Sequence, residues 1–232
     1  MPQKVSEWIE RCERVNRAKC NYTLWDNPVE IKSFVKENYP QYATIYDALP
    51  YDVQRFDLLR LMILHRFGGI YIDTDVECFR PVTDLLNDDD TCVFALEPQQ
   101  HAFDYERMPY IVGSYFIAAE AENPFILKLI ERIADTVFIK RSVHVPTQIM
   151  KSTGPARITE IYGEEKRNYK IRLLPSEFLS PLTAKEVKKY LLGKYYPQLN
   201  NAHGQHLYAG SWVDETENRL ELELLNFLKD KR

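Results

Sequence analysis

The feature that most constrains this 232-residue sequence is a helix, a glycine pair and a strand in succession within residues 56–77, F-D-L-L-R-L-M-I-L-H-R-F-G-G-I-Y-I-D-T-D-V-E. Gly68 stands where helices commonly end in a left-handed residue. Gly69 has no side chain, so we expect a ligand or another chain segment to approach the backbone closely there. Residues 70–72 predict a short apolar strand. Residues 55–67 lack glycine and proline and predict an amphipathic helix, with apolar residues at helical spacing: Phe56, Leu59, Ile63 and Phe67.

Two aspartates, Asp73 and Asp75, follow the predicted strand. In an extended chain, residues two apart point to the same side, so both carboxylates are expected to share one space. Two isolated carboxylates would repel, and one would tend to take up a proton. A divalent cation such as Mg²⁺ or Mn²⁺ removes that conflict, because hard cations prefer oxygen ligands. One helical turn separates Asp57 from Arg60, so they share a helix face and are expected to reach the same ligand.

The whole stretch resembles the signature of the DXD-containing sugar transferases of glycosyltransferase family thirty-two. That family includes fungal mannosyltransferases and bacterial capsule enzymes, with the clostridial glucosylating toxins as more distant relatives. A bare D-x-D is a weak signal, but the combined D-x-x-R, G-G, aromatic and D-x-D spacing is strong. The matching positions are Asp57, Arg60, Gly68, Gly69, Tyr71, Asp73 and Asp75.

The resemblance implies a role for each matching residue. Asp75 would bind the cation directly, while Asp73 would contact the ribose and reach the cation through water. Asp57 and Arg60 would hold the hydroxyls of the transferred sugar, and Tyr71 would touch the ribose. The predicted catalytic residues are therefore Asp57, Arg60 and Asp75, and the predicted donor-binding residues are Asp57, Arg60, Gly69, Tyr71, Asp73, Ser211 and Trp212.

Residues 206–212, H-L-Y-A-G-S-W, resemble the closing H-x-x-A-G-S-W motif of the same family. A neutral imidazole suits Mn²⁺ beside carboxylate ligands, so the predicted cation ligands are Asp73, Asp75 and His206. Ser211 and the indole N–H of Trp212 are expected to donate hydrogen bonds to the diphosphate.

The family implies a single α/β domain of the GT-A type over residues 1–232, a mixed sheet flanked by helices, with the cation site at the carboxyl end of the strand that carries Tyr71. Family members normally open with a further strand whose tryptophan helps to hold the base. This sequence starts at or just after that point, so we expect the strand to be absent or base recognition to differ. Further elements are predicted from periodicity and turn residues: helices over 5–15, 124–137, 184–192 and 214–229, a helix that opens at residues 27–28, and strands over 21–26, 91–96, 110–119 and 171–174.

Three further segments carry local expectations. Asn27 is predicted to cap the second helix, with proline in its first turn. Residues 87–90, N-D-D-D, predict a solvated turn, and residues 97–109 predict a loop over the acceptor side. The T-G-P at 153–155 also matches the family, and Thr153 is expected to cap the helix that follows.

Composition narrows the function classes further. A formal charge of -4 and a pI near 5.8 give no reason to expect a nucleic-acid surface. No apolar run is long enough to cross a bilayer, and the N-terminal residues contain no signal-peptide core. The four cysteines, at positions 12, 20, 78 and 92, fit no zinc motif, so we interpret them as reduced, mostly buried thiols of a cytoplasmic protein.

The predicted function is transfer of a hexose from a nucleoside diphosphate sugar to a hydroxyl of a glycan or glycoprotein, with Mn²⁺ or Mg²⁺ as cofactor. UDP-glucose, UDP-galactose and GDP-mannose are among the candidate donors, and family membership implies retention of anomeric configuration. The alternative is a noncatalytic nucleotide-sugar-binding module of a larger assembly. Two other carboxylate motifs fit poorly, because a dehalogenase-type phosphatase needs Thr or Val where Glu77 stands and an EF-hand needs Gly where Cys78 stands.

Overall fold

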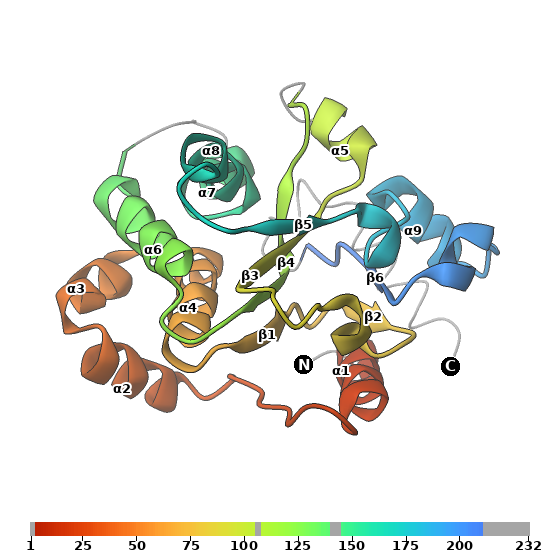
Figure 1. The fold of residues 1–232 in the computed structure, drawn as a ribbon, viewed down its shortest axis with the longest axis horizontal. Coiled ribbons are helices and arrows are strands. Elements are labelled where there is room, and N and C mark those ends of the chain that lie inside the picture. Colours follow the sequence, from red (N-terminus) through yellow and green to blue (C-terminus); the bar gives the residue numbers. More distant parts are fainter. Residues whose placement is uncertain (1–2, 105–107, 140–144, 211–232) are drawn as a thin grey trace.

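A mixed sheet of four strands, in the order β1-β4-β3-β5, forms the centre of the computed structural model, which describes residues 3–104, 108–139 and 145–210 (Figure 1). β4 is antiparallel to both β1 and β3, whereas β5 is parallel to β3. The strands are β1 (Gly69–Ile72), β3 (Cys92–Leu96), β4 (Val112–Ala119) and β5 (Arg172–Leu174). All but one of the predicted strands are therefore confirmed, and so is the mixed α/β class.

Both faces of the sheet are covered, which explains why β4 is buried along its whole length. Alternate β4 residues point to opposite faces, so Ile117 joins the larger hydrophobic core while Phe116 joins a second core. The larger core lies under α4 (Asp52–Phe67), α6 (Pro124–Thr136) and α8 (Pro155–Glu165). The helices that complete this side are α2 (Pro28–Asn38), α3 (Pro40–Ala48) and α7 (Val145–Ser152).

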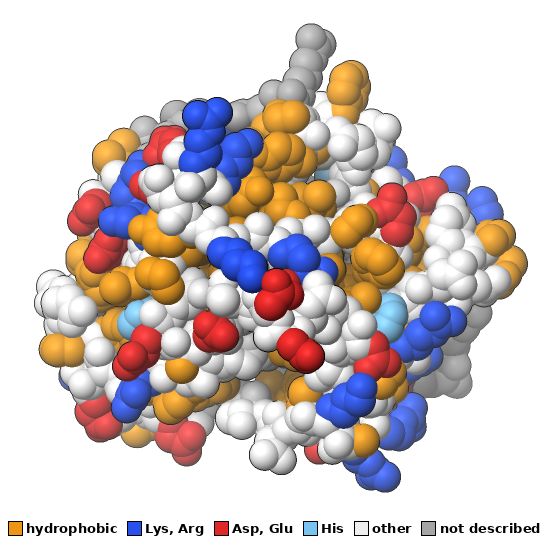
Figure 2. All heavy atoms as spheres, in the orientation of Figure 1, with side chains coloured by type: hydrophobic (Ala, Val, Ile, Leu, Met, Phe, Trp, Pro, Cys, Tyr) orange, Lys and Arg blue, Asp and Glu red, His pale blue; other side chains and the backbone are white. Residues whose placement is uncertain are grey.

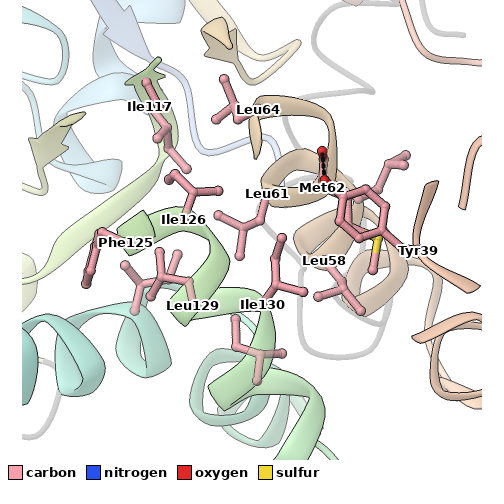
Figure 3. Close-up of a cluster of buried hydrophobic side chains, with 14 of the residues drawn as sticks. Tyr39, Leu58, Leu61, Met62, Leu64, Ile117, Phe125, Ile126, Leu129 and Ile130 are labelled. Atoms are coloured by element: carbon pink, nitrogen blue, oxygen red, sulfur yellow. Dashed lines mark hydrogen bonds between the residues drawn. The ribbon is translucent and has the colours of Figure 1, made fainter. Parts of the chain in front are cut away.

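Helix α4 is buried on more sides than an amphipathic pattern indicates. Figure 3 shows Leu58 and Leu61 of α4 on the side of Leu129 and Ile130 of α6, while Met62 lies beside Tyr39. Two residues of the predicted apolar face are instead exposed, Phe56 at 48% and Phe67 at 58%. The predicted face is confirmed at Leu59, which is buried, and at Ile63, which packs against the larger core. It was wrong at the two phenylalanines, because the run L-L-R-L-M-I-L is apolar nearly all around the helix and spacing alone does not select the core side.

The N-terminal region begins with α1 (Gln3–Asn16), as predicted. The predicted strand over residues 21–26 was wrong, because the segment pairs with no strand among the residues that the structure describes, and all but one of its residues are exposed. The second helix begins as expected, since the Asn27 side chain accepts a hydrogen bond from the Val29 backbone N–H at 3.0 Å. Within the described ranges, no helix has the length and apolar character that crossing a bilayer requires.

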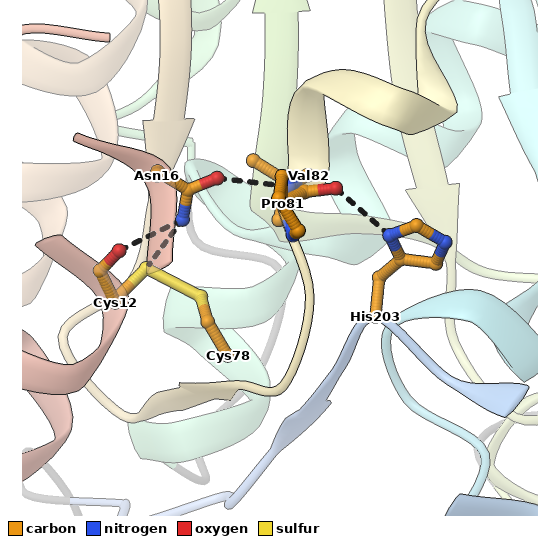
Figure 4. Close-up of a disulfide and its surroundings, with 6 residues drawn as sticks. All are labelled: Cys12, Asn16, Cys78, Pro81, Val82 and His203. Atoms are coloured by element: carbon orange, nitrogen blue, oxygen red, sulfur yellow. Dashed lines mark hydrogen bonds between the residues drawn. A yellow bond between two sulfur atoms is a disulfide. The ribbon is translucent and has the colours of Figure 1, made fainter. Parts of the chain in front are cut away.

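A second, two-stranded sheet joins β2 (Val76–Cys78) to β6 (Gly204–His206) in antiparallel register, with Val76 opposite His206. α1 packs against β2, and a disulfide links Cys12 to Cys78 (Figure 4). The expectation of four reduced thiols was therefore wrong for this pair, because the fold brings two cysteines together that are 66 residues apart. Cys20 and Cys92 are free.

The remaining elements are short and mostly follow β3 and β5. Helix 184–192 is confirmed as α9, with Thr183 and Glu186 forming a capping box. Residues 214–229 lie outside the described ranges. Figure 2 shows acidic and basic side chains interspersed over one face of the molecule, consistent with the small net charge. The remaining short helices are η1 (Val82–Leu85), α5 (Gln99–Asp104), η2 (Ser176–Phe178), α9 (Ala184–Leu191) and η3 (Pro197–Asn201).

The disulfide closes a long loop, so we expect it to stabilise the fold by restricting the unfolded chain. The double variant Cys12→Ser/Cys78→Ser should unfold at lower urea than the oxidised protein, with a loss of about 2–4 kcal/mol. Cys20→Ser, at a free thiol, is the matched control and should change little. Equal stability of the wild-type protein with and without a reductant would contradict a disulfide between these residues.

Asp90 is held more firmly than the solvated turn predicted for residues 87–90. Its carboxylate accepts two hydrogen bonds from Arg172, one of them from Nε at 2.6 Å, and its side chain is 9% exposed. The Arg172 hydrogen bonds lower the pKa of Asp90 below its usual value.

We predict that Asp90→Asn lowers the free energy of unfolding by about 1–2 kcal/mol at pH 7, because Arg172 loses a charged acceptor. A depressed folded pKa gives stability that is complete above the unfolded value of about 3.9 and is lost as pH falls through the folded pKa. Urea unfolding of the wild type and Asp90→Asn between pH 7 and pH 3 measures the difference in their free energies of unfolding. A difference that stays constant over this pH range would contradict a stabilising role of the ionised Asp90 carboxylate.

Candidate active site

The two aspartates of the D-x-D lie in a turn between β1 and β2 rather than in one continuous strand. The Val76 backbone N–H donates to the Asp73 carbonyl at 3.1 Å, and residues 74 and 75 form the turn. The strand argument for their shared orientation was therefore wrong, but the carboxylates still converge. Asp73, Asp75 and His206 each offer one ligand atom, and these atoms all lie within 4.8 Å of one another.

Asp75 is tied to the C-terminal segment by three contacts. Its Oδ2 accepts from the Ala209 backbone N–H at 2.9 Å, its carbonyl accepts from the Leu207 N–H at 2.8 Å, and its Oδ1 lies 3.5 Å from His206 Nε2. Burial would raise the pKa of Asp75, but His206 and the hydrogen bond from the Ala209 N–H together outweigh it and lower that pKa. Burial would lower the pKa of His206, but the carboxylates of Asp75, Glu97 and Asp73 together outweigh it and raise the pKa to about 9.

The predicted ligand set fits a divalent cation. Two carboxylates and one imidazole supply oxygen and nitrogen donors of the kind that Mn²⁺ accepts. His206 Nδ1 is buried without a hydrogen-bond partner among the described residues. Burial raises the pKa of Asp73 despite the opposing charge of Arg60, which is the conflict that a bound cation would relieve.

Arg60 connects this cluster to α4. Its Nη2 donates to Asp57 Oδ1 at 2.8 Å, and its Nη1 donates to Asp73 Oδ1 at 3.0 Å and to the Ser114 carbonyl at 2.8 Å. The guanidinium lies over the Tyr71 ring, 4.8 Å from its centroid, and the Tyr71 hydroxyl donates to Asp73 Oδ1 at 2.6 Å. The structure therefore brings four of the predicted site residues, Asp57, Arg60, Tyr71 and Asp73, into one hydrogen-bonded group.

Asp57 and Arg60 form a buried ion pair. Asp57 is 5% exposed and Arg60 is 6% exposed. Burial raises the pKa of Asp57, while Arg60 and the Thr153 hydroxyl oppose that rise. Burial acts to lower the pKa of Arg60, but Asp73, Tyr71 and Asp57 together raise it above its ordinary value. Arg60 therefore stays charged, and its Nε is left buried without a hydrogen-bond partner in the described part of the chain.

Sequence reasoning missed the structural role of Thr153. The predicted cap was wrong, because Gly154 is the residue that precedes α8 and no side chain caps the helix. The Thr153 side chain is fully buried and instead donates to Asp57 Oδ2 at 2.7 Å. The match of T-G-P to the family motif was the signal for this residue. Glu97 and Tyr208, which lie beside His206, were also missed, and neither stands in a motif position that the prediction used.

Of the predicted donor-binding residues that the structure describes, Gly69 is not joined to the cluster. Gly69 begins β1, opposite Ala119, while Asp73 follows the other end of that strand. A side chain at Gly69 would meet nothing within 4 Å, so its φ of +101° rather than a close approach favours glycine there. At Gly68 a Cβ would lie 2.6 Å from the Ala121 nitrogen, so the close approach is made by the chain itself. Ser211 and Trp212 lie outside the described residues.

Comparison with known proteins points to one enzyme class. Residues 2–92 match a family described as "Glycosyltransferase sugar-binding region containing DXD motif". Inositol phosphoceramide mannosyltransferase 3 of Schizosaccharomyces pombe is 29% identical over 61% of this chain and 36% of its own length. Mannosyl phosphorylinositol ceramide synthase CSH1 of Saccharomyces cerevisiae is 28% identical over 72% of this chain and 44% of its own length. This chain therefore spans less than half of either relative.

The solved structure of PaToxG Glycosyltransferase aligns with a TM-score of 0.51 at 17% identity, covering 72% of this chain and 66% of that one. At this identity the likeness concerns the fold, and it confirms the glycosyltransferase-type α/β architecture. The resemblance drawn from the motif is confirmed by the family match and by the relatives together.

We predict that Thr153→Val destabilises the protein by about 2 kcal/mol, because the buried Asp57 carboxylate loses a donor at Oδ2. Thr153→Ser keeps the hydroxyl and should lose only the packing of one methyl group, about 1 kcal/mol. Urea unfolding of the three proteins tests this. A valine variant that unfolds at the same urea concentration as the wild type would show that the hydrogen bond to Asp57 contributes nothing.

Proposed function

Because this chain is related to the DXD-containing glycosyltransferases, we propose that it transfers a hexose from a nucleoside diphosphate sugar to a hydroxyl of an acceptor, with retention of configuration. The convergence of Asp73, Asp75 and His206 with the Asp57–Arg60 pair in one buried group carries this proposal. Asp73, Asp75 and His206 offer ligands for a cation beside a diphosphate. The Asp57–Arg60 pair offers a carboxylate acceptor and a guanidinium donor for sugar hydroxyls.

An unpartnered donor supports the sugar-binding role of Arg60. Its Nη atoms are occupied by Asp57, Asp73 and the Ser114 carbonyl, but its buried Nε has no partner among the residues described. A buried donor without an acceptor is costly, and a sugar hydroxyl would satisfy it. Asp57 uses one oxygen for Arg60 and the other for Thr153, and each carboxylate oxygen can accept a second hydrogen bond.

The chemistry requires cleavage of the bond between the anomeric carbon and the diphosphate oxygen. Asp73, Asp75 and His206 would hold a divalent cation, which when bound supplies Lewis-acid stabilisation of the negative charge on the leaving diphosphate. Asp57 and Arg60 hold the sugar so that its anomeric carbon is oriented for departure of the diphosphate. The acceptor oxygen bonds to the anomeric carbon on the face that the diphosphate leaves, and the departing phosphate oxygen takes the acceptor's proton.

The relatives favour one sugar. The two named fungal relatives are a mannosyltransferase acting on inositol phosphoceramide and a mannosyl phosphorylinositol ceramide synthase. We therefore favour mannose, and GDP-mannose as donor, over UDP-glucose and UDP-galactose. These names add a lipid-linked inositol phosphate to the glycan and glycoprotein acceptors predicted from the sequence.

Nucleotide release from each of the three donors, with Mn²⁺ and then with EDTA, tests the proposal. GDP-mannose is expected to be the best substrate, EDTA should abolish turnover, and added Mn²⁺ should restore it. Asp75→Asn should reduce turnover by at least about 100-fold, because the site loses a charged ligand and binding of the cation fails. Asp90→Asn, which removes a buried carboxylate away from the D-x-D turn, is the matched control and should keep its rate.

Two results would count against the proposal. Turnover by Asp75→Asn at the wild-type rate would remove the D-x-D from the chemistry. Mn²⁺-dependent binding of a donor with no turnover on water or on glycan, glycoprotein and inositol phospholipid acceptors would instead identify a noncatalytic binding module.

A further inference from the structure

Glu97 lies beside His206, on the ring nitrogen that does not face Asp75. Asp75 Oδ1 is 3.5 Å from His206 Nε2, and Glu97 Oε1 is 3.8 Å from His206 Nδ1. The Glu97 side chain is 10% exposed, so its charge is largely removed from water. The imidazole therefore stands between two carboxylates, each facing a different ring nitrogen.

The Glu97 carboxylate is fixed by contacts that leave one oxygen for His206. Its Oε2 accepts from the Tyr208 hydroxyl at 2.9 Å and lies 3.4 Å from His101 Nδ1. His101 Nε2 accepts the Ala184 backbone N–H at 3.0 Å, so Nδ1 must carry the proton of that ring and donate toward Glu97. Oε2 is thus engaged by two donors, and Oε1 is the atom turned toward His206.

The His206 ring is also held in orientation by its neighbours. It stacks on Tyr115 at 4.5 Å between ring centroids and 19° between planes, and it contacts the Tyr208 ring at 4.1 Å. Tyr208 has a φ of +52°, which is uncommon for a non-glycine residue and costs free energy. Tyr208 thus has a strained backbone conformation, and its side chain both contacts the His206 imidazole and donates a hydrogen bond to Glu97.

The pairing leaves one polar atom unexplained. His206 Nδ1 is buried and makes no hydrogen bond among the described residues, because 3.8 Å exceeds the range of about 2.7–3.2 Å for an N–H···O bond. A histidine that binds a metal through one ring nitrogen usually donates the other N–H to a carboxylate or carbonyl, which fixes the tautomer and the ring orientation. Glu97 Oε1 is the carboxylate oxygen that the structure places opposite Nδ1.

We propose that Glu97 is a positioning residue that accepts the Nδ1–H of His206 and thereby keeps the Nε2 lone pair free for the cation. This inference rests on the proposed function, because it requires a cation at the D-x-D. Glu97 is not itself in the ligand set, since the three convergent ligand atoms come from Asp73, Asp75 and His206. Its effect passes through the imidazole.

A double-mutant cycle on Mn²⁺ affinity, measured by isothermal titration calorimetry, tests the proposal without relying on turnover. Glu97→Gln should weaken Mn²⁺ binding by about 10–100-fold, the usual effect of losing a carboxylate that orients a ligand. His206→Ala should also weaken binding. The double variant should bind no more weakly than His206→Ala alone, because Glu97 then has no ligand left to orient.

Three controls separate this inference from the proposed function. Asp90→Asn, a buried carboxylate that precedes the same strand, β3, should retain wild-type Mn²⁺ affinity although it is destabilised. Asp75→Asn should lose Mn²⁺ binding. Wild-type Mn²⁺ affinity in that variant would contradict the proposed cation site itself. Two results, each combined with loss of Mn²⁺ binding in Asp75→Asn, would overturn only the role of Glu97. One is wild-type Mn²⁺ affinity in Glu97→Gln. The other is a Glu97→Gln substitution that weakens Mn²⁺ binding by the same factor whether residue 206 is histidine or alanine.

A measurement on the wild-type protein covers the case in which Glu97→Gln does not fold. With diamagnetic Cd²⁺ in place of Mn²⁺, the ¹⁵N shifts of the His206 ring should show a protonated Nδ1 and an unprotonated Nε2. The opposite tautomer would overturn the assignment.

Discussion

The charge of the Arg60 guanidinium, buried between Asp57 and Asp73, is the constraint on which the rest of the site depends. Without the Arg60 guanidinium, the carboxylates of Asp57 and Asp73 would be driven toward protonation. Without these carboxylates, the buried guanidinium would be an unpaired charge that costs several kcal/mol. α4 supplies Asp57 and Arg60, and the turn after β1 supplies Asp73. The ion pairs of Arg60 thus join α4 to the turn that follows β1.

A second constraint is that the proposed ligands come from distant parts of the described chain. Asp75 and the Ala209 N–H that it binds are 134 residues apart, and the pairing of β2 with β6 sets His206 beside the D-x-D. α1 and its disulfide to Cys78 hold β2 from the other side. The proposed cation site would therefore depend on a small sheet outside the central one, formed by two strands of three residues each.

Much of this arrangement was predictable because it is encoded locally. The cap at Asn27, the end of α4 at Gly68 and the buried β4 follow from residue types and spacing. The errors occurred where long-range contacts decide: residues 21–26 have strand-like residues but no partner in the described structure, and Thr153 donates to Asp57 instead of capping a helix. Spacing also gives no indication that Cys12 meets Cys78 or that Glu97 faces His206.

The most direct test of this account is anomalous diffraction from crystals of the protein with Mn²⁺ and GDP. The account predicts one manganese peak in contact with Asp75 and His206 Nε2, beside the diphosphate, with Arg60 close to the position of the transferred sugar. A manganese ion bound elsewhere, with Asp75 and His206 still paired to each other, would contradict it.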